Sequence, residues 1–330
     1  MQVNKFKKIP KIELHLHLDC SLSYKVVSKI DSTINFDEYK SSFQASSSCS
    51  SLKDYISCAD RAIALMQTKE NLELIVEDLF EQLYDDNVIY VEIRFAPLLH
   101  CEKGLEAKEV VEIVSKSSSI QSKKYKIKYG LILCTLRHYS EEESLQTVKL
   151  VNQFSENGVV GFDIAADEAG HPIDNHIKAF NYAKNNNLNI TAHAGEAKGP
   201  ESIWETINEL HVKRIGHGVR CIEDKNLVNF LSENNYHLEI CVTSNIKTNT
   251  FESYNDHPLN QIFDSSISLS INTDGRAISN IDLSKEYEIL INKFNWTIEQ
   301  ILKCNLNAID HSFSSEQTKK ELRKLINISF

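Results

Sequence analysis

The chain has 330 residues, of which 42% are hydrophobic and only 10 are glycine and 5 proline, a composition typical of a globular protein and not of a disordered or fibrous one. The formal net charge of −10 argues against nucleic acid as a partner. No run of eighteen apolar residues occurs, and the first residues, MQVNKFKKIPK, lack an apolar signal-peptide core, so we expect no membrane partner and a cytoplasmic protein.

Short segments rich in β-branched and aromatic residues recur along the chain and are predicted to be strands. They lie at residues 11–18, 88–97, 126–136, 159–166, 188–196, 214–219, 236–245 and 268–274. Between them lie segments whose apolar residues return at helical spacing, such as 70–87 and 176–187. Eight strand–helix repeats predict a (β/α)8 TIM barrel in a single domain, residues 1–330, with extra C-terminal helices after residue 296.

The first predicted strand contains the segment IELHLHLD, residues 12–19. Alternation of period two puts His15 and His17 on one side of the strand, roughly 7 Å apart, which is a span that one metal ion can bridge. A polar edge strand with two surface histidines fits the same eight residues, so this segment alone leaves both interpretations open.

The connection from the first strand to the second, residues 19–87, is far longer than the usual βα loop and contains several predicted helices. On a barrel it follows the carboxyl end of a strand, where substrates bind. We therefore expect a helical insertion that serves as a lid.

Ionisable residues gather at the carboxyl ends of several predicted strands. His15 and His17 end the first strand, His193 and Glu196 the fifth, His217 the sixth and Asp274 the eighth. Barrel enzymes carry their chemistry on this face. Three imidazoles and one carboxylate are typical ligands of a single Zn²⁺ with room left for water, so the metal interpretation is favoured.

Several motifs together resemble the adenosine deaminase family of the amidohydrolase superfamily. They are HLHLD (15–19), ADEAG (166–170), AHAGE (192–196), GPESIWETI (199–207), RIGHGV (214–219), TSN (243–245) and SINTD (270–274). The resemblance extends from about Pro10 to the last helices. It implies a TIM barrel, one Zn²⁺ per chain and hydrolysis of adenosine or 2′-deoxyadenosine to inosine or 2′-deoxyinosine plus ammonia.

The same resemblance implies roles for individual residues. The metal ligands would be His15, His17, His193 and Asp274. The catalytic residues would be Glu196, which gives a proton to purine N1, and His217, which orients the attacking water and helps to deprotonate it. Substrate binding would involve His17 and Asp19 near the ribose and the backbone N–H of Gly170 at purine N3.

Alternative functions stay open at this point. One is a deaminase of another or modified 6-aminopurine, such as adenine or an adenosine derivative. A second is a two-metal hydrolase of cyclic amides, which is disfavoured because the fourth strand ends DIAADEAG, without the lysine that bridges two metals. A third is a non-catalytic nucleoside-binding protein. The sequence contains no feature that points to an oligomeric state.

Two positions depart from the family pattern. Gly275 stands where most members have an aspartate that contacts purine N7, and Cys20 stands where glycine is common. Either water or a nearby polar group, such as Ser279, Asn280 or Arg276, would then meet N7. On this basis 7-deazaadenosine is expected to be turned over within roughly tenfold of adenosine.

Three charged residues on the predicted strands receive other interpretations. Glu92 and Arg94 are expected to fill the barrel interior as ion pairs. For Asp163, support of a ligand histidine and a purely structural role are equally favoured.

Overall fold

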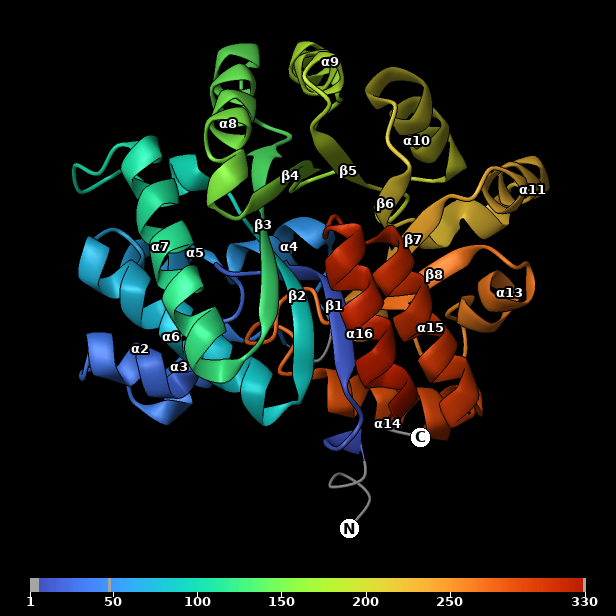
Figure 1. Ribbon diagram of the computed structural model, residues 1–330, viewed down its shortest axis with the longest axis horizontal. Helices are drawn as coiled ribbons and strands as arrows, with labels where there is room; N and C mark the ends of the chain where they lie inside the picture. Colours follow the sequence, from blue (N-terminus) through green and yellow to red (C-terminus); the bar gives the residue numbers. More distant parts are fainter. Residues whose placement is uncertain (1–5, 47–48, 329–330) are drawn as a thin grey trace.

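The chain folds into a closed parallel barrel in a computed structural model that describes residues 6–46 and 49–328. Within these residues eight strands form one sheet in chain order, and each strand pairs in parallel with the next (Figure 1). The strands are β1 Lys11–His17, β2 Val88–Phe95, β3 Lys128–Leu136, β4 Val159–Ala165, β5 Asn189–Ala194, β6 Arg214–His217, β7 His237–Ile240 and β8 Ser268–Ile271. The predicted (β/α)8 fold is confirmed.

The barrel closes between β1 and β8 through an irregular junction. Leu16 and Asp274 form an isolated parallel bridge, in which His17 N–H donates to Asp274 O (2.7 Å) and Asp274 N–H donates to His15 O (3.0 Å). Further down β1, the side chain of Asn272 accepts hydrogen bonds from the backbone N–H groups of Leu14 and His15. Side-chain and backbone groups around Asp274 thus replace a regular ladder.

Helices surround the barrel and fill the long first connection. The helices before β2 are α2 Tyr24–Ile30, α3 Phe36–Phe43, α4 Leu52–Ser57, α5 Asp60–Leu65 and α6 Lys69–Asp85. The later ones are α7 Ala107–Tyr125, α8 Glu141–Gln153, α9 Ile177–Asn185, α10 Pro200–Glu205, α11 Lys225–Glu233, α12 Val242–Lys247, α13 Leu259–Asp264, α14 Leu283–Phe294, α15 Ile298–His311 and α16 Glu316–Ile328. In Figure 1 the C-terminal helices α15 and α16 lie beside β1, as expected for helices that complete the outer ring.

Local sequence signals set several helix starts. Ser140 and Glu143 form a capping box at the start of α8, and Thr297 and Gln300 form another at α15, so that backbone N–H groups of the first turn have partners. At the C-terminal end of α14, Asn295 adopts a left-handed conformation with a φ of 58°, which ends the helix.

The strands end earlier than predicted at β7 and β8. The segment 236–245 was predicted as one strand, but β7 ends at Ile240 and Val242–Lys247 forms α12. At the start of this helix the N–H of Thr243 donates to a side-chain oxygen of Glu286 (3.1 Å). This tertiary contact cannot be predicted from the periodicity of the sequence.

Polar and charged side chains of the strands are buried inside the barrel. Every residue of β1 except His17 is buried, so the polar face of this strand points into the barrel and not into solvent. The interpretation as a polar edge strand is therefore wrong.

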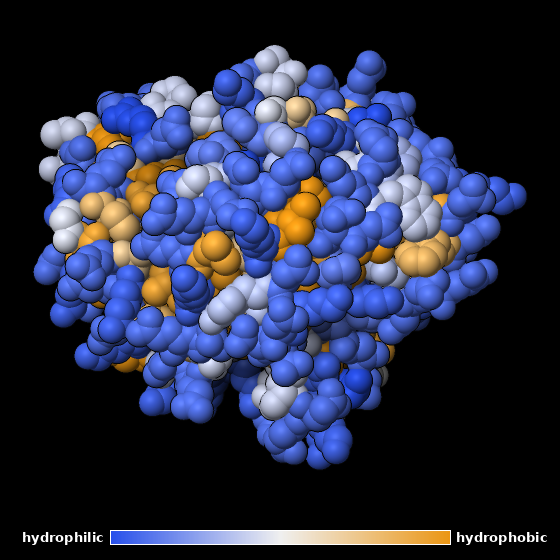
Figure 2. Space-filling view, turned by 90° about the horizontal axis from the view of Figure 1, so that it is seen from above, coloured by the Kyte–Doolittle hydropathy of each residue, from blue (hydrophilic) through white to orange (hydrophobic). Residues whose placement is uncertain are grey.

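The surface in Figure 2 is mostly hydrophilic, with small separate hydrophobic patches. None of the helices among the described residues is long and apolar enough to cross a membrane.

Candidate active site

Four histidines and one aspartate converge at the carboxyl ends of four strands. The ligand atoms of His15, His193, His217 and Asp274 lie within 4.8 Å of one another. His17 joins them, because its Nε2 lies 3.2 Å from His193 Nε2 and 3.5 Å from Asp274 Oδ1. All five residues are among those predicted from the sequence, and the fold brings them to one point.

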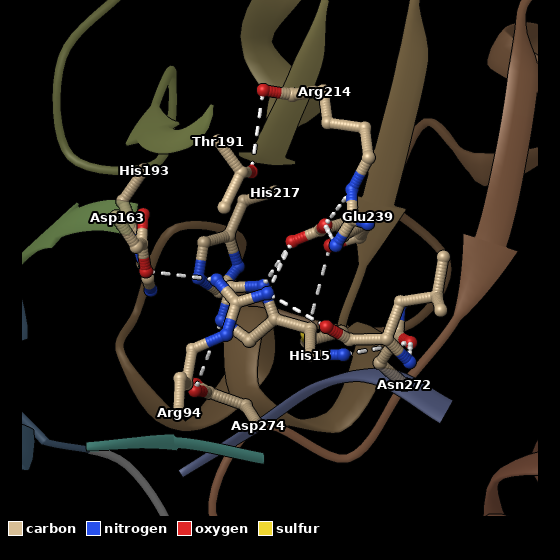
Figure 3. A network of polar contacts seen from close by, with 12 residues as sticks. His15, Arg94, Asp163, Thr191, His193, Arg214, His217, Glu239, Asn272 and Asp274 are labelled. Carbon is tan, nitrogen blue, oxygen red and sulfur yellow. Dashed lines mark hydrogen bonds and ion pairs between the residues drawn. The ribbon is translucent and has the colours of Figure 1, made fainter. Parts of the chain in front are cut away.

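Carboxylates behind two of these rings fix which nitrogen faces the centre. His15 Nδ1 lies 2.9 Å from Glu239 Oε2, and His193 Nδ1 lies 3.1 Å from Asp163 Oδ2 (Figure 3). Ionised carboxylates only accept, so each Nδ1 carries a hydrogen, and in the neutral ring each Nε2 presents a lone pair to the centre.

Two buried arginines keep these carboxylates ionised. Arg94 bridges Asp163 (2.9 Å) and Glu239 (2.7 Å), and Arg214 pairs with Glu239 from β6 (Figure 3). Although burial opposes ionisation, Arg214 and Arg94 hold the pKa of Glu239 well below its usual range. Arg214 also pairs with Glu92 (2.7 Å), so the predicted interior ion pairs are present and support the histidine cluster from below.

The residues of the cluster fit a divalent cation. His15 Nε2 is buried without a hydrogen-bond partner, although it lies 3.4 Å from Asp274 Oδ1. His193 directs a lone pair at the same point, with His17 Nε2 close by. Lone pairs and a carboxylate oxygen that face one another in a buried site repel unless a cation lies between them, and nitrogen with oxygen ligands suits zinc.

The tautomer of His217 follows from a chain of hydrogen bonds that begins at a backbone amide. Burial lowers the pKa of His257 to about 3, so this ring is neutral. Leu259 N–H donates to His257 Nδ1 (3.2 Å), which leaves the hydrogen on Nε2 to donate to Asn245 Oδ1 (3.2 Å). Asn245 therefore turns its NH2 group to His217 Nδ1 (3.1 Å). His217 then carries its hydrogen on Nε2, 3.5 Å from Glu196 Oε2.

Glu196 is a buried carboxyl beside this cluster. Its burial, with the negative charges of Asp274 and Glu168 nearby, raises its pKa well above the usual value. Because burial favours the protonated form of a carboxyl group, Glu196 is suited to give a proton to a bound molecule. Asn245 and Thr248 lie within 3.4 Å of its other oxygen and orient it.

The loop that carries Glu196 is held by a second carboxylate, Glu168. Its Oε1 accepts from Gly195 N–H (2.7 Å) and the Ser202 hydroxyl (2.6 Å). Its Oε2 accepts from the backbone N–H groups of three consecutive residues, 196–198, at 2.6–3.0 Å. Glu168 is therefore a positioning residue for the loop after β5.

Of the twelve described non-glycine residues with a positive φ, three lie at or just after the carboxyl ends of strands. They are Ala166 after β4 (φ 78°), His217 at the end of β6 (φ 59°) and Asp274 after β8 (φ 65°). Such conformations cost free energy, about 1–2 kcal/mol each, and concentrate at functional sites. All three line the cavity above the cluster.

This cavity is covered by the insertion. Leu52 and Tyr55 of α4 and Asp60 of α5 line it opposite the histidines. Asp19 also lines it, and burial raises the pKa of Asp19 to about 6. Helices α4 and α5 of the insertion thus line the cavity, and their role as a lid stays a prediction.

Gly170 does not reach the cavity. It is exposed, and its N–H donates to Asp167 Oδ1 (3.1 Å) within its own turn. The predicted contact of this N–H with a purine is not supported, because the turn itself uses the donor. Ala166, four residues earlier in the same motif, lines the cavity instead.

Comparisons with known proteins agree with the site. The adenosine deaminase family matches residues 10–328 of this sequence. The chain belongs to the adenosine deaminase family. An adenosine deaminase of Clostridium acetobutylicum is 38% identical over 326 residues, 97% of each chain.

Solved structures give the same fold for other members of this group. The N6-mAMP deaminase of Arabidopsis superposes with a TM-score of 0.88 at 26% identity, covering 98% of this chain and 99% of that one. An adenine deaminase from Arthrobacter aurescens superposes with a TM-score of 0.89 at 23% identity, covering 97% and 98% respectively, which shows a shared fold.

Sequence reasoning missed several residues that support this family site. Glu239 and Arg214 lie on strands that were predicted, but their partners are distant in the chain. Glu168 lies inside the quoted ADEAG motif, yet only the structure shows that it caps the loop of Glu196. No sequence motif singles out His257, and it proves to be buried and to set the tautomer of His217 through Asn245.

Proposed function

We propose that this chain is a zinc-dependent adenosine deaminase, which replaces the 6-amino group of adenosine or 2′-deoxyadenosine by oxygen from water and releases ammonia. One observation carries the proposal: the buried carboxyl of Glu196 and the imidazole of His217, with 3.5 Å between Oε2 and Nε2, line the same cavity as other residues of the histidine cluster. The curated relatives named adenosine deaminase support it.

We place one Zn²⁺ on His15, His17, His193 and Asp274. The tautomer of His217 supports this choice over a site that uses His217, because a ring nitrogen that carries hydrogen cannot bind a metal. When bound, zinc supplies a Lewis acid that activates water near neutral pH.

The chain's own groups then carry the proton transfers. Glu196 donates its proton to purine N1, so that the ring can accept electrons as water adds to C6. The Nε2 hydrogen of His217 holds the attacking oxygen in place, so we assign His217 an orienting role. The proton that the water loses would pass by way of the ionised Asp274 carboxylate to the departing amino nitrogen, which leaves as ammonia. His17 and Asp19 are placed near the ribose, and the backbone of Ala166 replaces Gly170 at purine N3.

The cavity favours a nucleoside over a nucleotide. Among the described residues that line it, none is lysine or arginine, whereas Asp19 and Asp60 are acidic. A 5′-phosphate beside these carboxylates would be repelled and would lack a charged partner. This argues against AMP or N6-methyl-AMP as the substrate of this chain.

We further propose that residues 19–87 act as the lid of a single catalytic domain, because α4 and α5 cover the cavity. Location in the cytoplasm stays a prediction from the sequence.

The test is a substrate panel with the purified zinc-loaded protein. We expect loss of adenosine absorbance with release of one ammonia per inosine, little turnover of AMP, and about one zinc per chain. Glu196→Gln should keep the zinc while lowering kcat by at least ~10²-fold. A chelator should abolish activity.

Other outcomes separate the alternatives. Turnover of adenine in preference to adenosine would indicate a nucleobase deaminase, and preference for N6-methyl-AMP would contradict the charge argument. Binding of adenosine without ammonia release at full zinc occupancy would favour a nucleoside-binding protein. Two metals per chain would overturn the single-metal assignment.

A further inference from the structure

The space beside Asp274 is filled in an unusual way. A Cβ atom on Gly275 would lie 2.7 Å from Cys20 Cβ, 3.2 Å from Cys20 O and 3.3 Å from the Tyr55 hydroxyl oxygen. The first of these distances is too short for any side chain at position 275 unless the neighbours move. Cys20 and Tyr55 therefore occupy the volume that a larger residue after Asp274 would use.

Tyr55 brings a polar atom into this volume from the insertion. Its side chain is 4% exposed and lines the cavity. The hydroxyl group lies 2.8 Å from Ser279 Oγ, and Ser279 is buried as well. Burial raises the pKa of Tyr55 well above its usual value, so the phenol keeps its hydrogen.

The other polar residues of this loop face elsewhere. Arg276 is buried in ion pairs with Glu13 (2.7 Å) and Asp86 (3.0 Å), away from the cavity. Asn280 is exposed. Of the three side chains that the sequence offered near this position, only Ser279 is close to the cavity, and it reaches it through Tyr55.

Barrel order places Tyr55 across the cavity from Glu196. Cys20 follows β1 and Gly275 follows β8, whereas Glu196 follows β5, which is opposite β1 in a ring of eight strands. In adenine, C6 carries the amino group and is bonded to N1 on one side and to C5 on the other, and C5 in turn carries N7. A purine whose N1 meets Glu196 therefore turns N7 toward the side of β8 and β1.

We infer that the Tyr55 hydroxyl donates a hydrogen bond to purine N7 and makes Tyr55 a specificity-determining residue. The inference rests on the proposed function. N7 can only accept, and a phenol can donate to it while it accepts from the Ser279 hydroxyl. Because α4 belongs to the insertion, reading of N7 is coupled to the position of the lid. This replaces the expected tolerance of 7-deazaadenosine with discrimination against ligands that lack N7.

Two unreactive ligands test the contact by binding alone. 1-Deazaadenosine keeps N7 but cannot be protonated at position 1, and 1,7-dideazaadenosine lacks both nitrogens. Calorimetry with the zinc-loaded protein should give a Kd for the second ligand about 10- to 100-fold weaker than for the first, the size of one buried hydrogen bond. In Tyr55→Phe the first ligand should weaken by the same factor, and the two ligands should then bind within about threefold of each other.

Control variants separate recognition from structure. Tyr139→Phe changes another buried tyrosine, one that does not line the cavity, and should keep the wild-type ratio. Ser279→Ala should weaken 1-deazaadenosine severalfold and leave 1,7-dideazaadenosine unchanged. Zinc content and thermal unfolding confirm that each variant is folded.

The outcomes are distinct. If the wild-type protein binds both ligands equally, or if Tyr55→Phe keeps the wild-type ratio, the inference is overturned. If Tyr55→Phe weakens both ligands equally, Tyr55 only shapes the lid, which also overturns it. Adenosine turnover is measured on the same wild-type sample, and its absence would reject the proposed function whatever the ratio.

Discussion

At the scale of single residues, Glu168 is expected to affect catalysis by positioning the loop of Glu196, without contacting the substrate. One carboxylate accepts four backbone N–H groups of the loop that carries Glu196. In Glu168→Gln an NH2 group replaces one of its oxygens and meets N–H donors, so we expect the loop to shift. The prediction is a fall in kcat of about tenfold or more at unchanged zinc content, measured by steady-state kinetics and metal analysis.

Glu201→Gln is the matched control for that variant. Glu201 also accepts from a backbone N–H of the same loop, that of Gly199 (3.0 Å), but it is exposed. Its kcat should stay within about twofold of wild type. Equal losses in both variants would show that the loop tolerates no change at all, and normal turnover in Glu168→Gln would remove its positioning role.

Ala166 carries backbone strain that glycine would relieve. Its φ of 78° is costly for an L-residue with a Cβ atom. We predict that Ala166→Gly raises the free energy of unfolding by about 0.5–1 kcal/mol, measured by denaturant titration of the zinc-loaded protein. Ala165→Gly, one residue earlier in β4, should lower it by a similar amount or more. A loss of stability in Ala166→Gly would show that the strain is offset locally.

At the scale of elements, the insertion is fastened to the barrel at a few points. Lys247 of α12 donates from its ammonium group to Ser46 O (2.8 Å), and its own backbone carbonyl accepts from Cys49 N–H (2.9 Å). Ala45 N–H donates to Ile278 O (2.8 Å). These contacts hold the segment just before α4, which covers the cavity.

Removal of the Lys247 ammonium group should therefore make α4 less firmly held over the cavity. For Lys247→Met we predict a KM for adenosine about three- to tenfold higher with a smaller change in kcat, because substrate is held less well while the catalytic groups stay in place. Lys29→Met, exposed on α2 of the same insertion, is the control and should leave both constants unchanged. A fall in kcat alone would contradict the lid assignment.

The extent of each element could be predicted only where local signals decide it. Short runs rich in β-branched and aromatic residues located all eight strands, and the carboxyl ends of β1, β5, β6 and β8 pointed to the site. The end of β7 could not be predicted, since α12 begins where Thr243 N–H donates to a side-chain oxygen of Glu286, 43 positions later. In the same way ADEAG offered a glycine, and only the folded turn shows that Asp167 already uses the N–H of Gly170.

At the scale of the whole molecule, the stability should depend on a carboxyl group that the chemistry does not use. Glu286 of α14 is fully buried, and burial raises its pKa to about 8, against the opposing hydrogen bonds from Thr243. One of its oxygens has no partner. Between about pH 4.5 and about pH 8 the folded state therefore binds more protons than the unfolded state, and stability contributed by this group falls as pH rises.

Glu286→Gln removes that titration. We predict that the wild-type protein loses on the order of 2 kcal/mol of unfolding free energy between about pH 5.5 and about pH 7.5 relative to this variant, measured by denaturant titration at both values. Glu288→Gln, partly exposed on the same helix, should follow the wild type. Parallel pH curves for wild type and Glu286→Gln would show that Glu286 is ionised throughout.

The barrel closes where β1 meets the residues that follow β8. The two hydrogen bonds of its bridge use the backbones of His15, His17 and Asp274, whose side chains are the proposed zinc ligands. A metal ion that draws these side chains together also stabilises the two hydrogen bonds of the bridge. Metal affinity and closure of the barrel are therefore thermodynamically linked. Chelation should therefore speed hydrogen exchange at the amides of His17 and Asp274 far more than at the amides of β3 and β4. Zinc should then stabilise the closed barrel as well as serve catalysis.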